Sequence, residues 1–286
     1  MVCDHLQKVI LLGLQVLSEF SARHPDRAGN LLLVPSVGFY QTTGEQGVQS
    51  MSLSGISTSE NKLLAALSTK CRDRLGPDLE FLHLPLGEIL YHPNTSIKYV
   101  YFPRWSAVSM VNIFEDGSMV EVGVVGREGI VGASLLSGDN VSPYQAIVQM
   151  ADGAWRMKAR VFKDELASNG ELDNLTRRYS QALFTQVAQT AACNRLHPIV
   201  ERLARWLLLM QERVESDTLH LTHEFIATML GARRAGVTLA AGTLQKAMII
   251  KYNRGRVIIL DRDKLEQVAC ECHRIVRDEF ERLLGK

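Results

Sequence analysis

Six basic side chains lie close together in one stretch of this chain, and their chemistry suits a polyanion. The stretch runs from Phe225 to Leu260, contains no Asp or Glu, and holds Arg233, Arg234, Lys246, Lys251, Arg254 and Arg256. Because the whole chain has a formal net charge of only +1, the positive charge is concentrated here. Basic side chains that neutralise the phosphates of a duplex release counterions, so this stretch favours salt-dependent nucleic-acid binding. A solvated basic face on an ordinary helical module is the alternative.

Two short helices are predicted to position these basic residues. Thr222 is a suitable N-cap, and apolar residues then recur at helical spacing as far as Leu230. Gly231 suits a helix end that requires positive φ, and a second helix is expected from about Arg233 to Ala247. Its inward stripe is Val237, Ala240, Ala241, Leu244 and Met248. Two helices joined through a glycine turn predict a helix-turn-helix.

A β-hairpin is predicted immediately after the second helix. Ile249–Ile250 and Val257–Leu260 are β-prone, and Asn253-Arg254-Gly255 between them indicates a turn. The complete unit is then a winged helix, a scaffold on which the basic stretch favours DNA. The candidate DNA-contacting residues are Thr222, Arg233, Arg234, Thr238, Lys246, Lys251, Arg254 and Arg256. Arg234 suits the O6 and N7 acceptors of guanine, whereas the basic residues of the hairpin suit the phosphate backbone.

Composition is that of an ordinary globular protein rather than a membrane protein. The chain has 286 residues, of which 46% are hydrophobic and 22% charged, enough for two domains with their own cores. No run approaches the roughly 18 apolar residues of a spanning helix. Five cysteines without regular spacing indicate reduced thiols, so a cytoplasmic protein is expected.

The middle of the chain is predicted to form a small β domain. A helix expected over Lys62–Leu75 is followed by short β-prone runs separated by turn signals. The runs are Leu79–Leu84, Glu88–Tyr91, Tyr99–Phe102, Ala107–Phe114, Val120–Val125, Gln145–Met150 and Trp155–Val161. Short strands at this spacing predict a jelly roll or small barrel.

Helices are predicted on either side of the winged helix. A long one over Leu172–Asn194 has Leu175, Tyr179, Leu183 and Val187 on one face. Such a helix between two globular parts often pairs with its copy, so these residues are the candidate dimer seam; packing on its own domain is the alternative. A last helix is expected from Arg262 to Leu284. The fold class is therefore α+β.

This order of elements, with several short phrases, resembles the Crp–Fnr family of bacterial transcription regulators over residues 60 to 260. The phrases are Leu84–Tyr91, Val100–Pro103, Val120–Gly123 with Gly126–Gly129, Leu203–Leu208 and Leu221–Phe225. Composition suggests an N-terminal extension over residues 1–58, a linker or disordered arm. The resemblance implies a cyclic-nucleotide-binding-like sensor roll (59–165), a dimerisation helix (166–196) and a DNA-binding domain (197–286). It implies double-stranded DNA, a second copy and RNA polymerase as partners, with no membrane, and a second helix that reads the major groove.

The predicted roll departs from the branch of that family that binds cyclic AMP. That branch carries a Gly-Glu-Leu turn and, about ten residues later, Arg-Ser; here the sequences are Gly132-Ala133-Ser134 and Ser142-Pro143. Without the arginine, a buried phosphate lacks its charge-assisted partner, so an effector other than cyclic AMP, or none, is expected. The candidate effector pocket is Arg127, Glu128, Gly132 and Ser134, with an ion pair between the first two as the alternative.

No metal, cofactor or catalytic site is predicted. Cys270 and Cys272 are two residues apart on one expected helix and would point to opposite sides. Cys193 and His197 can share a helical face, but two ligands are too few. A thiol sensor at Cys71 or Cys193 is a minor alternative.

No catalytic arrangement stands out, so an enzyme is not expected. The alternative to a DNA-binding regulator is a ligand- or redox-sensing module whose winged helix binds protein. A pulldown that is insensitive to salt and independent of DNA would favour that alternative.

Overall fold

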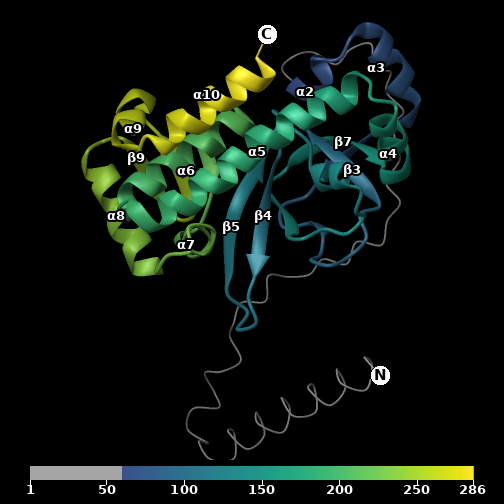
Figure 1. The fold of residues 1–286 in the computed structure, drawn as a ribbon. Helices are drawn as coiled ribbons and strands as arrows, with labels where there is room; N and C mark the ends of the chain where they lie inside the picture. The colour runs from purple at the N-terminus through teal and green to yellow at the C-terminus, as the bar shows by residue number, and fades with distance from the viewer. Residues whose placement is uncertain (1–59, 286) are drawn as a thin grey trace, which may run out of the picture. The chain divides into compact units, whose positions relative to one another are not determined.

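The structure is a computed structural model that describes residues 60–285; the predicted extension 1–58 lies outside this part. Within it, no helix is both long and apolar enough to cross a membrane. The elements follow the predicted order of a β domain, a long helix and a winged helix, and the fold class is α+β as predicted (Figure 1).

The β domain consists of two antiparallel sheets. One has the order β1-β7-β3, formed by Glu80–Leu84, Asp152–Lys158 and Tyr99–Pro103. The other has the order β2-β6-β4-β5, formed by Ile89–Tyr91, Gln145–Met150, Ala107–Ile113 and Met119–Val125. Each of the seven predicted runs overlaps a strand, although β7 begins three residues before its predicted run. The last one ends early, at Lys158, because helix α4 (Ala159–Ala167) begins there.

The helix predicted over Lys62–Leu75 is instead two short helices, α2 (Lys62–Ala65) and α3 (Thr69–Leu75). The break arises at Ser68, whose hydroxyl accepts a hydrogen bond from the backbone N–H of Cys71 and so starts a new helix. A 3-10 turn, η3 (Gly76–Asp78), leads into β1.

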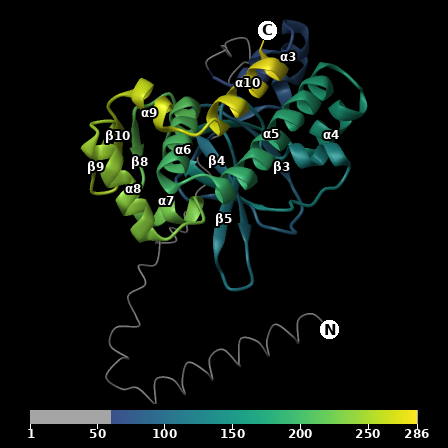
Figure 2. The ribbon, with the colours of Figure 1, turned by 60° about the vertical axis from the view of Figure 1, so that its left-hand side comes forward.

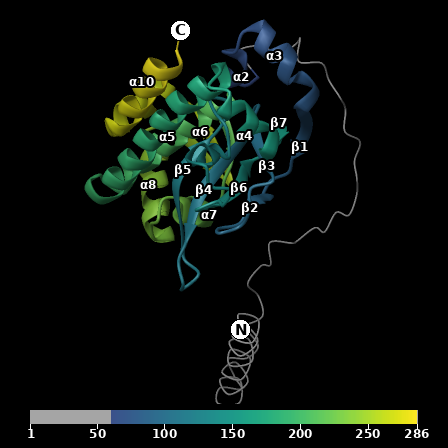
Figure 3. The ribbon, with the colours of Figure 1, turned by 45° about the vertical axis from the view of Figure 1, so that its right-hand side comes forward.

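The long helix α5 (Glu171–Leu196) crosses from the β domain to the winged helix, and α10 (Cys272–Leu284) lies alongside it (Figures 1 and 3). Tyr179 of α5 is fully buried against the β domain. A Cβ placed on Gly129 would lie 2.0 Å from the Tyr179 ring, so only glycine allows this close approach. The core of the β domain thus continues into one face of α5.

The winged helix is built on α6 (Ile199–Val214), whose apolar side packs against α8 (Arg234–Lys246); α7 (His223–Met229) packs against α8. Strands β9 (Ile250–Asn253) and β10 (Arg256–Ile259) form the predicted hairpin (Figure 2). A third strand, β8 (Thr218–His220), pairs with β10 and was not predicted, because three residues carry too short a pattern to recognise.

The helix predicted from Arg262 to Leu284 is also broken, into α9 (Arg262–Val268) and α10. Ala269 has extended dihedral angles, φ −66° and ψ 144°, which end the first helix. Cys270 therefore lies between the helices, while Cys272 is the first residue of α10.

A buried carboxyl joins the β domain to the winged helix. Glu121 of β5 accepts hydrogen bonds from the Ser109 hydroxyl at 2.6 Å and from the Trp206 indole of α6 at 2.9 Å. Burial raises the pKa of Glu121 from 4.5 to about 7, and these hydrogen bonds offset only part of the effect. The joint therefore holds a group that changes charge near neutral pH.

We expect this carboxyl to make stability fall as pH rises. Because its pKa is higher in the folded chain, folding takes up a proton between pH 4.5 and about 7; the stabilisation is full below pH 4.5 and is lost as pH rises through about 7. Glu121→Gln should reduce the difference in free energy of unfolding between about pH 5 and pH 8 by roughly 2–3 kcal/mol. Denaturant titrations of the wild type and the variant at the two pH values measure this free energy of unfolding.

The exposed Glu115, in the β4–β5 turn, provides the control substitution Glu115→Gln, which should keep the pH dependence of the wild type. An unchanged pH dependence in Glu121→Gln would contradict a titrating carboxyl at this joint.

Candidate nucleic-acid interface

The two helices of the predicted helix-turn-helix have the local structure that the sequence indicates. The Thr222 hydroxyl caps α7 by accepting a hydrogen bond from the Phe225 N–H at 3.1 Å, and Gly231 has a φ of +56°. Helix α8 buries Val237, Ala240, Ala241 and Leu244 as predicted. Met248, predicted to face inward, is instead 68% exposed, because α8 ends before it and its φ is +56°.

All eight predicted DNA-contacting residues are exposed. They are Thr222, Arg233, Arg234, Thr238, Lys246, Lys251, Arg254 and Arg256. The first five come from the two helices and their flanks, and the last three from the β9–β10 hairpin, the wing. The turn of the wing approaches α7, since a Cβ on Gly255 would lie 3.4 Å from the Thr222 methyl. Helices and wing therefore contribute to one basic surface.

The wing turn explains why its basic residues point outward. Arg254 and Gly255 have φ values of +46° and +76°, the pattern of a two-residue type I′ turn between Asn253 and Arg256. This turn follows the twist of β9 and β10 and leaves the side chains of Arg254 and Arg256 exposed to solvent.

His223, which the sequence analysis did not single out, connects the three parts of this surface. Its ring stacks on Tyr252 of the wing with centroids 3.9 Å apart, and its Nδ1 lies 3.1 Å from the Thr238 hydroxyl of α8. Burial, together with the positive charge of Arg234, lowers the pKa of His223. The neutral ring is thus favoured, so His223 orients Thr238 and the wing rather than adding charge.

An acidic residue also belongs to the surface, although the basic stretch itself contains none. Glu224 of α7 lies 3.5 Å from the Arg234 guanidinium, and both side chains are at least 70% exposed. Such an exposed ion pair is weak, so Arg234 remains free to exchange Glu224 for another acceptor. Leu239, 74% exposed on α8, adds an apolar side chain that the sequence analysis also missed.

A buried arginine holds this unit against the rest of the chain. Arg213, only 4% exposed, donates to the backbone oxygens of Val124 and Leu209 and to the side chain of Gln186, at 3.3, 3.0 and 2.5 Å. It also pairs with Glu128 at 3.2 Å. The β domain, α5 and α6 meet at this one guanidinium.

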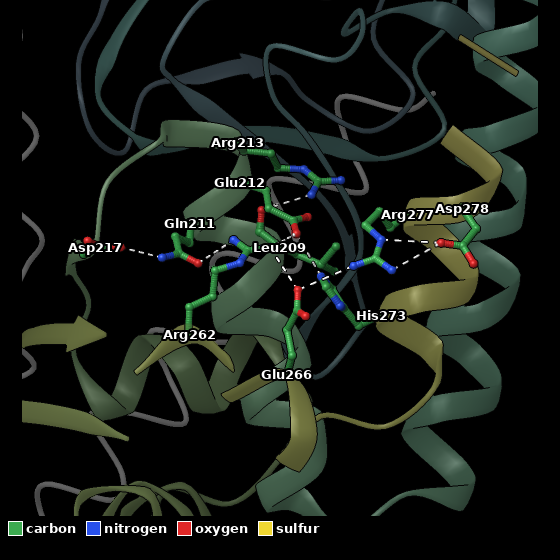
Figure 4. Close-up of polar contacts among 10 residues, drawn as sticks. All are labelled: Leu209, Gln211, Glu212, Arg213, Asp217, Arg262, Glu266, His273, Arg277 and Asp278. Atoms are coloured by element: carbon green, nitrogen blue, oxygen red, sulfur yellow. Dashed lines mark hydrogen bonds and ion pairs between the residues drawn. The ribbon is translucent and has the colours of Figure 1, made fainter. Parts of the chain in front are cut away.

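A second polar network ties α6 to α9 and α10 (Figure 4). Glu212 accepts from Arg262 at 2.7 Å and lies 3.0 Å from His273, while Arg262 also contacts Glu266. Burial tends to raise the pKa of Glu212, but His273 and Arg262 outweigh it and hold the pKa at about 2. Because arginines occupy the carboxylates of Glu212 and Glu266, this group is an ion-pair network and not a metal site.

The predicted effector residues lie in two separate places. Arg127 and Glu128 line a cavity of about 580 Å³ between the β domain, α6 and α10. Arg127 pairs with Glu215 and lies over the Trp105 ring. Glu128 pairs with Arg213 of α6, and Glu215, the partner of Arg127, is the residue that ends α6. Arg127 and Glu128 therefore both form ion pairs with α6 or its C-cap.

Gly132 and Ser134 are not among the residues that line this cavity. Gly132 has a φ of +105° and precedes the 3-10 turn η4 (Ala133–Ser137), which contains Ser134.

The predicted seam residues mostly face the core of their own chain. Leu175, Tyr179 and Leu183 are 5%, 0% and 8% exposed, and Val187 is half-buried. The most apolar stripe of α5 packs on the β domain because that domain offers a large apolar surface. Periodicity indicated an apolar face but not which partner covers it.

Known proteins share this organisation. The family model of the Crp-like helix-turn-helix domain matches residues 201–268. The global nitrogen regulator of Synechococcus elongatus is 22% identical over 219 residues, which cover 73% of this chain and 97% of that protein.

Two solved structures share the fold. FixK2 from Bradyrhizobium japonicum has a TM-score of 0.57 at 15% identity, over 67% of this chain and 98% of FixK2. A CRP-family transcriptional regulator from Thermus thermophilus has a TM-score of 0.54 at 20% identity, over 66% of this chain and 96% of that one.

The segment that matches the Crp-like model contains the capped α7, the glycine turn, α8 and the wing described above. The β domain and the long helix precede it, as in a Crp/Fnr protein. Members of this family are transcription regulators and not enzymes. The chain is therefore a DNA-binding transcription regulator of Crp/Fnr type.

Proposed function

We propose that two copies of this chain bind a two-fold DNA site, with α8 of each copy in a major groove, and that any effector differs from cyclic AMP. The observation that carries the proposal is the exposed face of α8, which presents Arg234, Thr238 and Leu239 while its other face is buried. A helix held in this way reads base edges in the major groove.

The three side chains on this face suit different base edges. The Arg234 guanidinium matches the two acceptors of guanine, and Leu239 matches the methyl group of thymine. The Thr238 hydroxyl is already oriented by its contacts with His223 and with the Arg234 carbonyl. Sequence selectivity therefore depends chiefly on Arg234.

Phosphate contacts surround this face. The first turn of α8 has no acidic residue and no side-chain cap at Arg233, so its free N–H groups and the helix dipole favour a phosphate there. Lys251, Arg254 and Arg256 of the wing are exposed and suit the backbone of the adjacent groove. These contacts supply affinity that decreases with salt.

Arg234→Ala should relax the selected DNA sequence at one base pair of each half-site. The lost bidentate contact with guanine should cost about 1–3 kcal/mol at that position. Selection from a random duplex pool, followed by titration of the selected site, measures both effects.

Lys251→Ala is the matched control for phosphate binding. It should weaken all sequences about equally and reduce the slope of log K against log salt by about 1. A selected sequence unaffected by Arg234→Ala would contradict base reading by α8. Absence of binding even at low salt would favour the protein-binding alternative.

The exposed side of α5 is the surface we assign to the second copy. Phe184 is 67% exposed, and Ala188 and Ala191 follow it at intervals of four and three residues. Arg177 and Arg195 continue the stripe at coiled-coil spacing. An exposed aromatic flanked by alanines suits close packing of two such helices.

Phe184→Glu should convert a dimer into a monomer. Two glutamates facing each other at the centre of the pair would be buried without partners, which strongly disfavours association. Sedimentation equilibrium at micromolar concentration measures the state. Arg178→Glu, which introduces the same glutamate on an exposed but different side of α5, should remain dimeric. A dimeric Phe184→Glu would contradict this seam.

Two features support an effector other than cyclic AMP. The stretch from Gly132 to Pro143 contains no arginine. A Cβ placed on Gly132 would lie 2.8 Å from the Tyr91 hydroxyl and 3.0 Å from Val100, so the turn is tightly packed against the roll. CLP of Xanthomonas campestris, with a TM-score of 0.55, is described as responsive to c-di-GMP, so a similar fold serves a different nucleotide in that protein.

A further inference from the structure

Four side chains from distant parts of the sequence converge where α5 ends and α10 begins. They are Cys193, His197, Cys270 and Cys272, and their ligand atoms all lie within 4.8 Å of one another. The Cys193 and Cys270 sulfurs are 3.5 Å apart, as are the Cys272 sulfur and the His197 Nδ1. All three cysteines are at most 6% exposed.

The local structure explains this convergence, although the sequence predicted no metal site. Cys193 and His197 are four residues apart, and α5 continues as far as Leu196, so both side chains lie on one side of the helix end. The extended Ala269 ends α9, so Cys270 lies between α9 and α10 and is not opposed to Cys272 on one helix. Packing of α10 along α5 then brings the two pairs together.

The geometry points to a single tetrahedral ion, and we propose that these three cysteines and one histidine bind Zn²⁺. Zinc holds sulfur at about 2.3 Å and nitrogen at about 2.0–2.1 Å, so neighbouring tetrahedral ligand atoms lie about 3.5–3.8 Å apart. The two separations of 3.5 Å match this spacing. A closed set of four protein ligands is typical of structural zinc sites rather than catalytic ones.

Groups around the cluster also suit a metal. The other ring nitrogen of His197, Nε2, lies 3.3 Å from a Glu271 carboxylate oxygen, the arrangement that orients a metal-binding imidazole. The Gln189 amide donates to the Cys272 sulfur at 3.1 Å. Both contacts remain possible after the sulfur and Nδ1 have bound an ion.

Charge is balanced within the protein. Three thiolates and one Zn²⁺ carry a net charge of −1, and the buried Arg205 lies near enough to favour the Cys193 thiolate electrostatically. The Arg205 Nε has no hydrogen-bond partner among the described residues. Zinc binding displaces the remaining thiol protons into solvent.

The spacing disfavours an iron–sulfur cluster. The ligands of such a cluster are divided among two or more iron atoms, so the whole set spreads farther than the ligands of one ion. Here all four ligand atoms lie within 4.8 Å of one another. The zinc site would join the end of α5 to the last helix, independently of any DNA contact. Its failure would therefore leave the proposed function intact.

Elemental analysis of the purified full chain tests the site. After exposure to Zn²⁺ under reducing conditions and removal of free metal, we expect about one zinc per chain. Cys270→Ser and Cys272→Ser should lose it, whereas Cys71→Ser, which changes a buried cysteine of α3, should retain it. Circular dichroism and gel filtration show whether each variant folds.

Glu271→Gln provides a variant that does not disturb folding, because this side chain is 60% exposed. Loss of the carboxylate partner of His197 should weaken zinc binding about 10–100-fold, measured by competition with a chromophoric chelator. Cobalt bound in place of zinc should give the visible absorption of a tetrahedral thiolate site in the wild type, and the two serine variants should lack it.

Three outcomes would overturn the site. One is a folded, reduced wild type that binds no zinc. Another is bound zinc that Cys270→Ser and Cys272→Ser both retain. The third is a disulfide between Cys193 and Cys270 that forms in air while the reduced chain still fails to bind metal.

Discussion

The buried guanidinium of Arg213 is the constraint on which the arrangement of the chain depends. A charge with so little access to water is tolerated only when its donors are satisfied, and its partners come from three different elements. Separating the β domain, α5 or α6 would leave a buried charge without its acceptors. The orientation of the winged helix relative to α5 is therefore strongly restricted, and so is the orientation of α8 in each copy of a dimer.

Two further contacts follow from this arrangement. The Trp206 indole reaches Glu121 of β5, and Gly231, in the turn before α8, approaches Val120 so closely that a Cβ would lie 2.9 Å from it. The turn of the helix-turn-helix thus rests on the same strand whose far end contacts Arg213. A ligand that shifts β5 relative to α6 would therefore also move the turn that precedes α8. It can do so only if the ligand binds the shifted and unshifted arrangements of β5 with different affinity.

The sequence was most informative where a local rule decides the structure. The Thr222 cap, the positive φ of Gly231 and the turn at Arg254-Gly255 each follow from the chemistry of one or two residues. Six of the seven strands predicted in the β domain agree with the observed limits to within one residue, because alternation and turn residues define them locally; the run Trp155–Val161 is displaced from β7 by three residues. Strand β8 was not predicted because its three residues are recognisable as a strand only through their pairing with β10.

The predictions that failed concern which parts of the fold are in contact with one another. The stripe of Leu175, Tyr179 and Leu183 is a true helical face, but the β domain covers it, and sequence periodicity does not name the covering partner. The cysteine cluster was missed because one extended residue, Ala269, breaks the helix predicted as continuous over Arg262–Leu284, and because Cys193 and Cys270 are 77 residues apart. Contacts at such separation leave no periodic signal in one sequence.

Changing the spacing of the two half-sites tests most directly whether two reading helices act as a rigidly placed pair. Helices held about 34 Å apart meet successive major grooves on one side of the duplex, and inserting about five base pairs rotates one half-site to the opposite side. Titration of the selected palindrome and of this extended version, at the same salt concentration, compares their affinities. We expect the extended site to bind no more tightly than a single half-site, and equal affinity for both would contradict a rigid pair of reading helices.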